Sequence, residues 1–404
     1  MRELGMRNSI GRRELLAGAG AAALVGALQG CSVGILGSRA AAPPAAATPA
    51  LQLPRLRASS DRITNITVCT RPFRAQGPRL DVERVGAKTV VHNYGHGGSG
   101  WSLSWGSSAI ATQKALATGE RDIAVIGCGA LGMTSALQLQ RAGARVTIYA
   151  KDLPPNVRSS LASGLWTPDS RICLEEHATP EFKQLWQGMA RQSFQTYQTL
   201  LGLPGNPVEF IDSYSVSDTP RVPRGNTPPP DTGKPRFADL QRELIPETIP
   251  NFVDFDPGQH NLGARYLRRF EFMMFNITAY ARMLLADFHA NGGKIEVREF
   301  HAPADFAALP EKTLINATGY GARGLFGDQS VTPVRGQLAR MIPDPVVNYA
   351  IFYKHVSFVP RRDGLVFQVT GEDEYYGFDN ESTAPDRQEA ELAVNTIAGL
   401  FAPV

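Results

Sequence analysis

The feature that most constrains the fold of this 404-residue chain is the stretch Arg121–Asp152, RDIAVIGCGALGMTSALQLQRAGARVTIYAKD. Its apolar residues predict a short buried strand at Ile123–Ile126, a helix at Met133–Arg141 and a second buried strand at Val146–Tyr149. Three glycines in the order G-x-G-x-x-G separate the first strand from the helix. A strand, a glycine turn, a helix and a strand within about thirty residues are typical of a unit that binds a dinucleotide.

Each glycine of this turn has a physical reason to be there. Gly127 permits a tight turn, Gly129 lets the backbone approach a pyrophosphate, and Gly132 lets the helix pack closely on the strand. The N-terminus of the predicted helix supplies free N–H groups and a partial positive charge that suits phosphate, and Ala130 and Leu131 lie between the glycines of the turn. We therefore predict that these five residues form part of a dinucleotide site.

An acidic residue at the end of the second strand commonly holds the adenosine ribose in such units. Here Ala150 is followed by Lys151 and Asp152. Asp152 lies twenty residues after Gly132 and could hold the ribose, whereas Lys151 could contact a phosphate instead. The sequence leaves both alternatives open, and both residues are predicted to lie at the cofactor.

A second distinctive segment, VVHNYGHGGSGWSLSWGSS, runs from Val90 to Ser108 and sets glycines among histidines, a tyrosine and tryptophans. Its core, HNYGHGGSG at His92–Gly100, resembles the signature loop of the D-amino-acid oxidase family, whose members oxidise amino acids with FAD. The resemblance extends over roughly Ser60–Val404 and is carried by three further segments: VCTRPFRAQGPRLD at Val68–Asp81, SSLASGLWTP at Ser159–Pro168 and VRGQ at Val334–Gln337.

The resemblance implies FAD as the cofactor and gives the glycine-rich loop a role. Glycines let the main chain lie against a flat flavin ring, where a Cβ would clash. The two loop histidines, His92 and His96, are interpreted as structural. Contacts with the cofactor are implied for the loop residues Gly97, Gly98, Gly100, Trp101 and Ser102, and for Ser159, Ser160 and Gly164 of the later turn.

The resemblance also implies how a substrate is held. Arg71 falls at the position of the arginine that clamps the substrate carboxylate, and a planar guanidinium can bind a carboxylate through two hydrogen bonds. The carbonyl of Gly98 would accept a hydrogen bond from the substrate amine. The segment Ala350–Pro360 is predicted as one strand, on which Tyr353 matches the first of two active-site tyrosines of the family. Ser357 stands where the second would be.

Later segments complete the predicted fold. Thr278–Asn291 is predicted as a helix, Lys294–Phe300 as a strand, and Thr313–Gly324 as a buried strand that ends in Ala-Thr-Gly. Thr318 and Gly319 of this last strand are predicted to approach the cofactor. The acidic and aromatic segment Gly371–Glu381 is interpreted as a solvated loop rather than a lid.

The predicted fold class is α/β. It combines a Rossmann-like FAD-binding domain of the glutathione-reductase type with an interleaved α+β substrate domain built on a mixed or antiparallel sheet. The FAD-binding domain is assigned to residues 80–161 and 276–330. The substrate domain is assigned to residues 60–79, 162–275 and 331–404.

The order of the motifs differs from the family, which carries its dinucleotide turn near the N-terminus and the glycine-rich loop near the C-terminus. Here the loop comes first, and Trp105–Asp122 reads as the family's last helix running directly into its first strand. The C-terminal segment Arg387–Val404 reads as a helix that would precede Ser60. Because the termini of compact domains are often close together at the surface, we interpret the chain as circularly permuted.

The first residues read as an export signal and a tether. Arg12 and Arg13 precede the apolar run Leu15–Leu28, which resembles a twin-arginine signal. The tetrapeptide that ends at Cys31 resembles a lipoprotein box, which would place a lipid anchor on Cys31; a plain signal peptide or a disordered tail is the alternative. Residues 1–31 are thus assigned as signal and 32–59 as an Ala/Pro-rich linker, predicting a periplasmic or outward-facing, membrane-anchored protein.

Composition narrows the function classes. The net charge is +3 and no basic stripe follows any segment, so nucleic acid is not a predicted partner. The four cysteines form no CxxC or zinc-type spacing, no metal site is predicted, and Cys69, Cys128 and Cys173 are expected to be buried free thiols. The hypothesis is FAD-dependent oxidative deamination of a D-amino acid, with O2 or a membrane acceptor taking the electrons. The alternatives are oxidation of glycine or another amine, and a non-catalytic flavin-binding lipoprotein.

Overall fold

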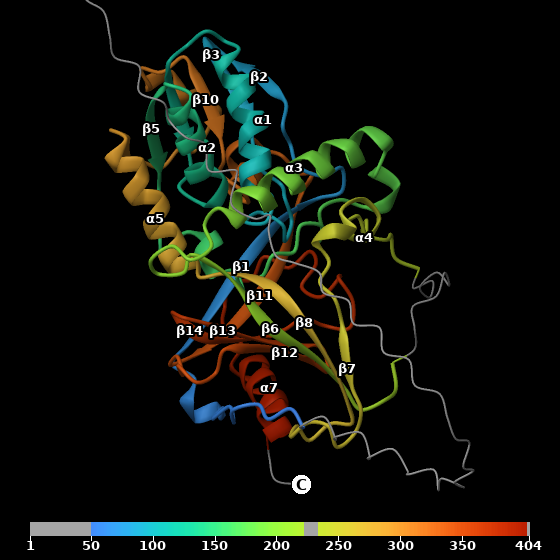
Figure 1. Cartoon of the computed structure of the whole chain (residues 1–404). Helices are drawn as coiled ribbons and strands as arrows, with labels where there is room; N and C mark the ends of the chain where they lie inside the picture. Colours follow the sequence, from blue (N-terminus) through green and yellow to red (C-terminus); the bar gives the residue numbers. More distant parts are fainter. Residues whose placement is uncertain (1–49, 222–232, 402–404) are drawn as a thin grey trace, which may run out of the picture. The chain divides into compact units, whose positions relative to one another are not determined.

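The computed structural model describes residues 50–221 and 233–401, which belong to one compact unit (Figure 1). The export signal, Cys31 and most of the linker lie outside the described residues. Between residues 50 and 401, excluding the gap, no helix combines the length and the apolar character that crossing a bilayer requires. The three cysteines in the described ranges are free and buried, which confirms that prediction.

A six-stranded sheet carries the dinucleotide motif. Its central strand β4 (Asp122–Ile126) pairs in parallel with β5 (Arg145–Ala150) on one side and β10 (Thr313–Asn316) on the other. After the exposed Asp122, the residues Ile123–Ile126 of β4 form a continuous apolar run, as is typical of a parallel strand covered on both faces. The remaining strands are β3 (Lys88–His92), β9 (Lys294–Val297) and the antiparallel edge strand β2 (Val82–Val85), in the order β2-β3-β10-β4-β5-β9.

Helices cover one face of this sheet. Helix α2 (Ala130–Arg141) follows the glycine turn and packs against α1 (Ser104–Leu116) and α5 (Ile277–Ala290). Their apolar faces join one core cluster with the sheet. The strand, turn, helix and strand predicted from the motif are all present, and Gly143 ends the helix region with a φ of 83°.

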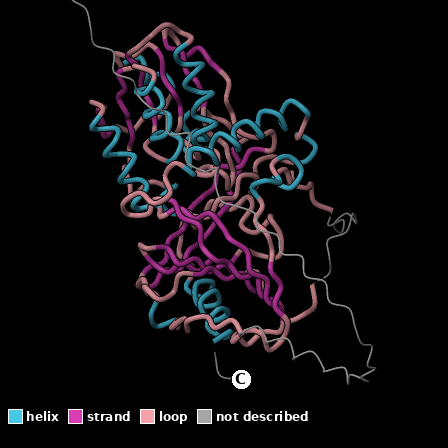
Figure 2. Tube along the Cα trace, in the orientation of Figure 1, coloured by secondary structure: helices cyan, strands magenta, loops and turns pink. Residues whose placement is uncertain are grey.

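An eight-stranded sheet forms the second layer seen in Figure 2. Helix α7 (Arg387–Ala398) covers one of its faces and packs on β14, β11 and β13. All neighbours are antiparallel except β12 and β6, so the sheet is mixed, as predicted. In spatial order the strands are β1 (Asn65–Arg74), β11 (Val331–Met341), β14 (Gly364–Val369), β13 (Val356–Arg361), β12 (Tyr349–Tyr353), β6 (Val208–Ser217), β8 (Tyr266–Phe275) and β7 (Val253–Phe255).

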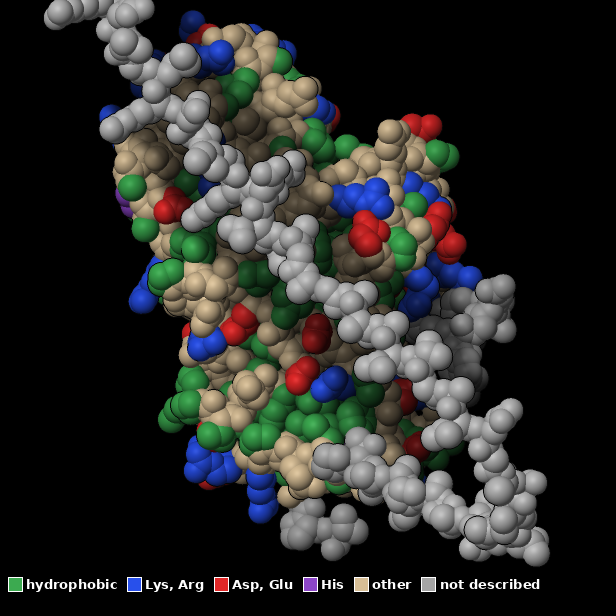
Figure 3. Space-filling view, viewed as in Figure 1, with side chains coloured by type: hydrophobic (Ala, Val, Ile, Leu, Met, Phe, Trp, Pro, Cys, Tyr) green, Lys and Arg blue, Asp and Glu red, His purple; other side chains and the backbone are tan. Residues whose placement is uncertain are grey.

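The remaining helices lie outside the two sheets. Helix α3 (Pro180–Gln198) packs on α1, and the Thr179 side chain caps its start by accepting a hydrogen bond from the Phe182 N–H. Within the described residues the other two α-helices are short, α4 (Gln241–Leu244) and α6 (Gly321–Leu325). On the face shown in Figure 3, Lys and Arg side chains are interspersed with Asp and Glu, so that face has no continuous basic surface.

Two sequence predictions need correction here. The segment Ala350–Pro360 is a hairpin rather than one strand, because Lys354 and His355 adopt left-handed conformations with φ of 46° and 59°. The packed chain also begins before Ser60, within the stretch assigned to the linker. Leu53 and Leu56 are buried in the core cluster between α7 and the larger sheet.

Candidate cofactor and substrate site

A cavity of about 790 Å³ is lined by residues of both sheets and of the loops between them. This volume lies within the usual range for small-molecule and cofactor sites. The cavity extends from the dinucleotide turn and the end of β5 to Arg71 on β1 and Ser357 on β13.

The glycine turn between β4 and α2 is held by close backbone contacts. Gly127 has a φ of 109°, and a Cβ at this position would lie 2.6 Å from the carbonyl oxygen of Ala317. A Cβ on Gly132 would lie only 2.0 Å from the Gly127 carbonyl oxygen, so α2 can approach β4 only with glycine there. Of the predicted cofactor residues, Gly127, Gly129, Ala130 and Leu131 line the cavity, whereas Gly132 contributes through packing and does not line it.

The start of α2 faces the later turn. The Ser159 hydroxyl accepts a hydrogen bond from the Ala130 N–H at 3.1 Å, and Ser159 lines the cavity. Gly164 of the same segment also lines it. Ser160 does not, although its buried hydroxyl has no partner among the described residues. The helix N-terminus thus lines the cavity through Gly129, Ala130 and Leu131, with the Ala130 N–H already bonded to Ser159.

Both candidate residues after β5 line the cavity, but their partners differ. The Lys151 ammonium lies 3.3 Å from Glu299, whereas Asp152 has no hydrogen bond or ion pair within the described ranges. An unpaired carboxylate can accept hydrogen bonds from ribose hydroxyls. The geometry therefore favours Asp152 as the ribose ligand. Arg298 and Phe300, which the sequence reasoning missed, line the same end of the cavity.

The glycine-rich loop lines the opposite part of the cavity with Gly97, Gly98, Gly100 and Trp101. Gly97 has a φ of 55°, and a Cβ on it would lie 1.9 Å from the Arg171 carbonyl oxygen, so this glycine is required by packing inside the protein. A Cβ on Gly100 would meet nothing within 4 Å, and the same holds for Gly319.

The open sides of Gly100 and Gly319 lie where a bound group could approach the backbone. Thr318 and Gly319, which were predicted to approach the cofactor, line the cavity after the end of β10. Ser102 does not line it, because its hydroxyl is used inside the fold to accept a hydrogen bond from the Thr167 N–H at 2.8 Å. The cavity thus has an anion-binding turn, a carboxylate for a ribose and a strip of bare backbone, which together fit a dinucleotide that carries a flat ring.

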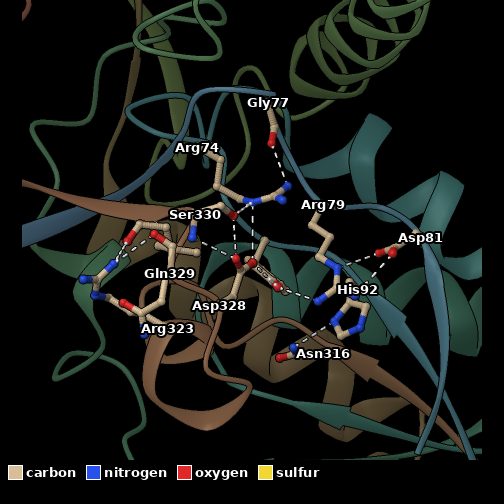
Figure 4. Close-up of polar contacts among 12 residues, drawn as sticks. Arg74, Gly77, Arg79, Asp81, His92, Asn316, Arg323, Asp328, Gln329 and Ser330 are labelled. Atoms are coloured by element: carbon tan, nitrogen blue, oxygen red, sulfur yellow. Dashed lines mark hydrogen bonds and ion pairs between the residues drawn. The ribbon is translucent and has the colours of Figure 1, made fainter. Parts of the chain in front are cut away.

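The first loop histidine belongs to a structural network (Figure 4). The His92 ring is buried, and the Glu83 carboxylate lies 2.9 Å from its Nε2. On the other side, the Asn316 amide lies 3.1 Å from Nδ1, as Figure 4 shows. Burial, aided by the charge of Arg79, lowers the pKa of His92, so its ring is neutral at pH 7. The network ties β3 to β10. His92 does not line the cavity, but Asn316 connects it to a residue that does, since the Thr318 hydroxyl donates to Asn316 Oδ1 at 2.7 Å.

The second loop histidine is buried but lines the cavity. His96 Nε2 lies 2.7 Å from the Ser107 hydroxyl, which itself donates to the Asn93 side-chain oxygen. Nε2 therefore carries the proton, and Nδ1 is an acceptor that has no partner among the described residues. An orphaned acceptor at a cavity wall is satisfied if a bound group donates a hydrogen bond to it.

The buried His96 should make the protein less stable in acid. Burial lowers its pKa to about 3, below the ordinary 6.5, so the unfolded chain binds a proton that the folded chain resists. The contribution of His96 is fully present above pH 6.5 and is lost as the pH falls toward 3. We expect His96→Gln to reduce the loss of unfolding free energy between pH 7.5 and pH 5 by about 2 kcal/mol in urea titrations. An unchanged pH dependence would contradict this assignment.

At the substrate end, the Arg71 guanidinium lines the cavity and packs over Gly336, where a Cβ would lie 2.6 Å from Nη2. Its one hydrogen bond within the described residues runs from Nη1 to the Arg335 carbonyl at 3.2 Å. Arg71 pairs with no carboxylate in those ranges, so it is available to an anion. The Gly98 N–H donates to the Ser170 carbonyl at 2.9 Å, which fixes the loop beside this end.

The structure does not bring Tyr353 to the cavity. Its hydroxyl lies 3.0 Å from both carboxylate oxygens of Asp218, at the end of β12. The turn at Lys354 and His355 separates it from Ser357, which lies on β13 and does line the cavity. The predicted catalytic position of Tyr353 is therefore corrected, since the prediction assumed one continuous strand.

Two cavity residues were missed because they come from loops. Tyr376 belongs to the segment Gly371–Glu381, which the sequence suggested was a solvated loop, and Arg171 lies in the turn after Trp166. The segment is docked by Gly377, whose carbonyl accepts a hydrogen bond from the Arg335 N–H at 2.8 Å. Its paired tyrosines between glycines were the available signal. In the described part of the chain, no group of three His, Cys, Asp or Glu side chains is placed to hold a metal ion.

Comparison with known proteins agrees with this geometry. The family model described as FAD dependent oxidoreductase matches residues 122–403. A D-amino-acid oxidase of Rubrobacter xylanophilus is 25% identical over 280 residues, covering 68% of this chain and 76% of that protein. A D-amino-acid oxidase of Streptomyces coelicolor is 27% identical over 299 residues, covering 70% and 78%.

Among solved structures, glycine oxidase from Geobacillus kaustophilus is similar with a TM-score of 0.47 and 13% identity, covering 69% of this chain and 77% of that one. The family match begins at the first residue of β4 and includes both later strands of the dinucleotide-binding sheet, β9 and β10. Because the match spans well over half of the 404 residues, the chain belongs to the FAD-dependent oxidoreductase family and uses FAD as its cofactor.

Proposed function

We propose that this flavoprotein deaminates a D-amino acid oxidatively. The observation that carries the proposal is the Arg71 guanidinium, which pairs with no carboxylate among the described residues and lies in the same cavity as the dinucleotide turn and the bare backbone of the glycine-rich loop. A fixed guanidinium beside a redox cofactor suits a small substrate that carries a carboxylate. The similarity to two D-amino-acid oxidases supports this choice among amine substrates.

The residues of the chain would hold the substrate in place. Arg71 would bind the α-carboxylate through two hydrogen bonds, and the Gly98 carbonyl would accept one from the amine. Among the described residues, the carboxylates that line the cavity are Asp152 and Glu299, both at the end near β5 and β9. The Arg71 end therefore offers position and charge rather than a carboxylate base.

FAD, when bound, supplies the acceptor for the two electrons that leave with the Cα hydrogen as hydride. The amine loses one proton as the C=N bond forms, and water then hydrolyses the imino acid to a keto acid and ammonia. O2, the acceptor proposed here, takes two electrons and two protons to give hydrogen peroxide. Transfer of the electrons to a membrane acceptor instead of O2 remains a second proposal.

An anaerobic titration tests the function directly. We expect the visible flavin band of the purified protein to bleach on addition of D-amino acids without oxygen, and to stay unchanged with the L-enantiomers. Glycine and secondary amines belong in the panel, because Ser357 lines the cavity where the resemblance places a tyrosine. Bleaching by those amines alone would replace the D-amino-acid assignment, and a bound flavin that none of them bleaches would contradict catalysis.

We also propose that the chain is circularly permuted relative to the family. Strand β1 and the pair β2–β3 precede the family match, yet β1 pairs with β11 along ten residues and β3 lies between β2 and β10. Ser60, near the start of the described residues, lies close to the last α-helix, since the Arg387 guanidinium donates to the Ser60 carbonyl at 2.7 Å. Export by a twin-arginine route, with or without a lipid on Cys31, stays a prediction from the sequence. Cleavage mapping of the mature N-terminus would test it.

A further inference from the structure

A second guanidinium lies at the Arg71 end of the cavity. Arg171 lines the cavity and has a φ of 50°, a left-handed conformation that is unfavourable for any residue with a Cβ. Gly97 holds the two segments together. Its N–H donates to the Pro72 carbonyl at 2.8 Å, and its missing Cβ leaves room for the Arg171 carbonyl. The loop therefore brings the residue next to Arg71 and the backbone of Arg171 to one place.

Among the described residues, no carboxylate forms an ion pair with either Arg71 or Arg171. Arg171 donates through Nε to the Glu374 carbonyl, and its other donors have no partner within residues 50–221 and 233–401. Burial, followed by the charge of Arg71, lowers the pKa of Arg171 to about 10, so it stays cationic at pH 7.

Two nearby acidic residues offset the charge only in part. Glu374 and Asp373 both favour the charged form of Arg171. However, Asp373 already pairs with Lys234 at 3.0 Å, and burial raises the pKa of the Glu374 carboxyl. Two positive charges held close together at a cavity wall repel each other while the site is empty. An anion that binds both guanidinium groups would offset this repulsion.

We propose that the substrate is an acidic D-amino acid, with its α-carboxylate on Arg71 and its side-chain carboxylate on Arg171. This inference rests on the proposed function and narrows it to one substrate class. Ser170 and Tyr376 also line the cavity.

The test compares each acid with its own amide, because D-asparagine and D-glutamine differ from D-aspartate and D-glutamate only in the second charge. We expect kcat/KM to favour one of the acids over its amide by about 10- to 100-fold. In Arg171→Met the preference should shrink to about one, while kcat/KM for D-alanine changes by less than about threefold. The inference would be overturned if kcat/KM were higher for an amide than for both acids. It would also be overturned if the preference for the acid persisted in Arg171→Met.

A binding measurement separates this inference from the proposed function. Malonate and acetate can be titrated against the flavin absorbance of the holoprotein, without turnover. We expect malonate to bind about tenfold or more weakly to Arg171→Met, with acetate little changed. Equal loss for both anions would overturn the second subsite. If no amino acid bleaches the flavin but malonate responds as expected, the proposed function fails while the dicarboxylate site stands.

Arg171 also holds the Gly371–Glu381 segment through its hydrogen bond to the Glu374 carbonyl, so a matched control variant is needed. Lys234→Met removes the ion pair with Asp373 in the same segment but changes no residue that lines the cavity. If Arg171 acts only by holding this segment in place, both Lys234→Met and Arg171→Met should lose the preference for the acid over its amide. A charge role predicts that Lys234→Met retains it and that Arg171→Lys restores part of it.

Discussion

Replacement of Arg71 by leucine should lower kcat/KM for D-amino acids by about 100- to 1000-fold, because a desolvated charge-assisted pair with the substrate carboxylate is lost. The loss should fall on KM for the substrate as well as on turnover, since the same contact orients Cα. FAD content and thermal stability should stay near wild type. Arg71 makes one hydrogen bond in the described structure, a 3.2 Å contact with the Arg335 carbonyl, and leucine can still cover Gly336.

The conservative variant sharpens this test. Arg71→Lys keeps the charge but loses the planar fork, so it should recover only part of the activity. Steady-state kinetics give kcat and KM for both variants, and the ratio of flavin to protein absorbance gives their FAD content. An Arg71→Leu protein with normal FAD content and normal kcat/KM would remove Arg71 from substrate binding and, with it, the main support for an amino-acid substrate.

The dinucleotide-binding unit could be predicted from the sequence because every determinant of it is local. The turn glycines, the helix and the two strands all lie within Arg121–Asp152, and each contact of the turn depends on the absence of a Cβ at a known position. The strand within Thr313–Gly324 was found for the same reason, since a buried strand followed by a glycine turn is a local pattern. It ends earlier than predicted, at Asn316, and Gly321–Leu325 form helix α6.

Tyr353 shows where local reasoning fails. The alternation of residues over Ala350–Pro360 suits a strand, and Lys354 and His355 are not residues that mark a turn. Both nevertheless adopt left-handed conformations, which the pairing of Phe352 with Ser357 and of Tyr353 with Val356 imposes. The turn is thus set by the sheet, and it moves Tyr353 away from the face that Ser357 presents to the cavity.

Arg171 and Tyr376 were missed for a related reason. They reach the cavity only because Gly97 and Gly377 allow two loops to dock against other parts of the fold, and these contacts join residues far apart in sequence. The burial of Leu53 and Leu56 is also a tertiary effect, since the sequence around them resembles a tether until α7 and the larger sheet provide a surface. Composition describes such segments alone and carries no information on what they pack against.

Substitution of Gly132 by alanine should be severely destabilising, although alanine is the better helix former by about 1 kcal/mol. The new Cβ would lie 2.0 Å from the Gly127 carbonyl oxygen, a backbone atom that cannot move without opening the phosphate-binding turn. Overpacking of this kind costs about 3 kcal/mol or more. We expect a lower melting temperature together with a loss of bound FAD, since helix and turn must separate.

Gly188 provides the matched control, because it is also a helical glycine but a Cβ on it would meet nothing within 4 Å. Gly188→Ala should therefore leave FAD binding unchanged and raise the free energy of unfolding by up to about 1 kcal/mol. Thermal unfolding measures the stability of both variants, and flavin absorbance measures how much FAD each one binds. If Gly132→Ala behaves like Gly188→Ala, the close contact of α2 with β4 does not constrain the site, and the steric requirement for glycine at the third position of the motif is wrong.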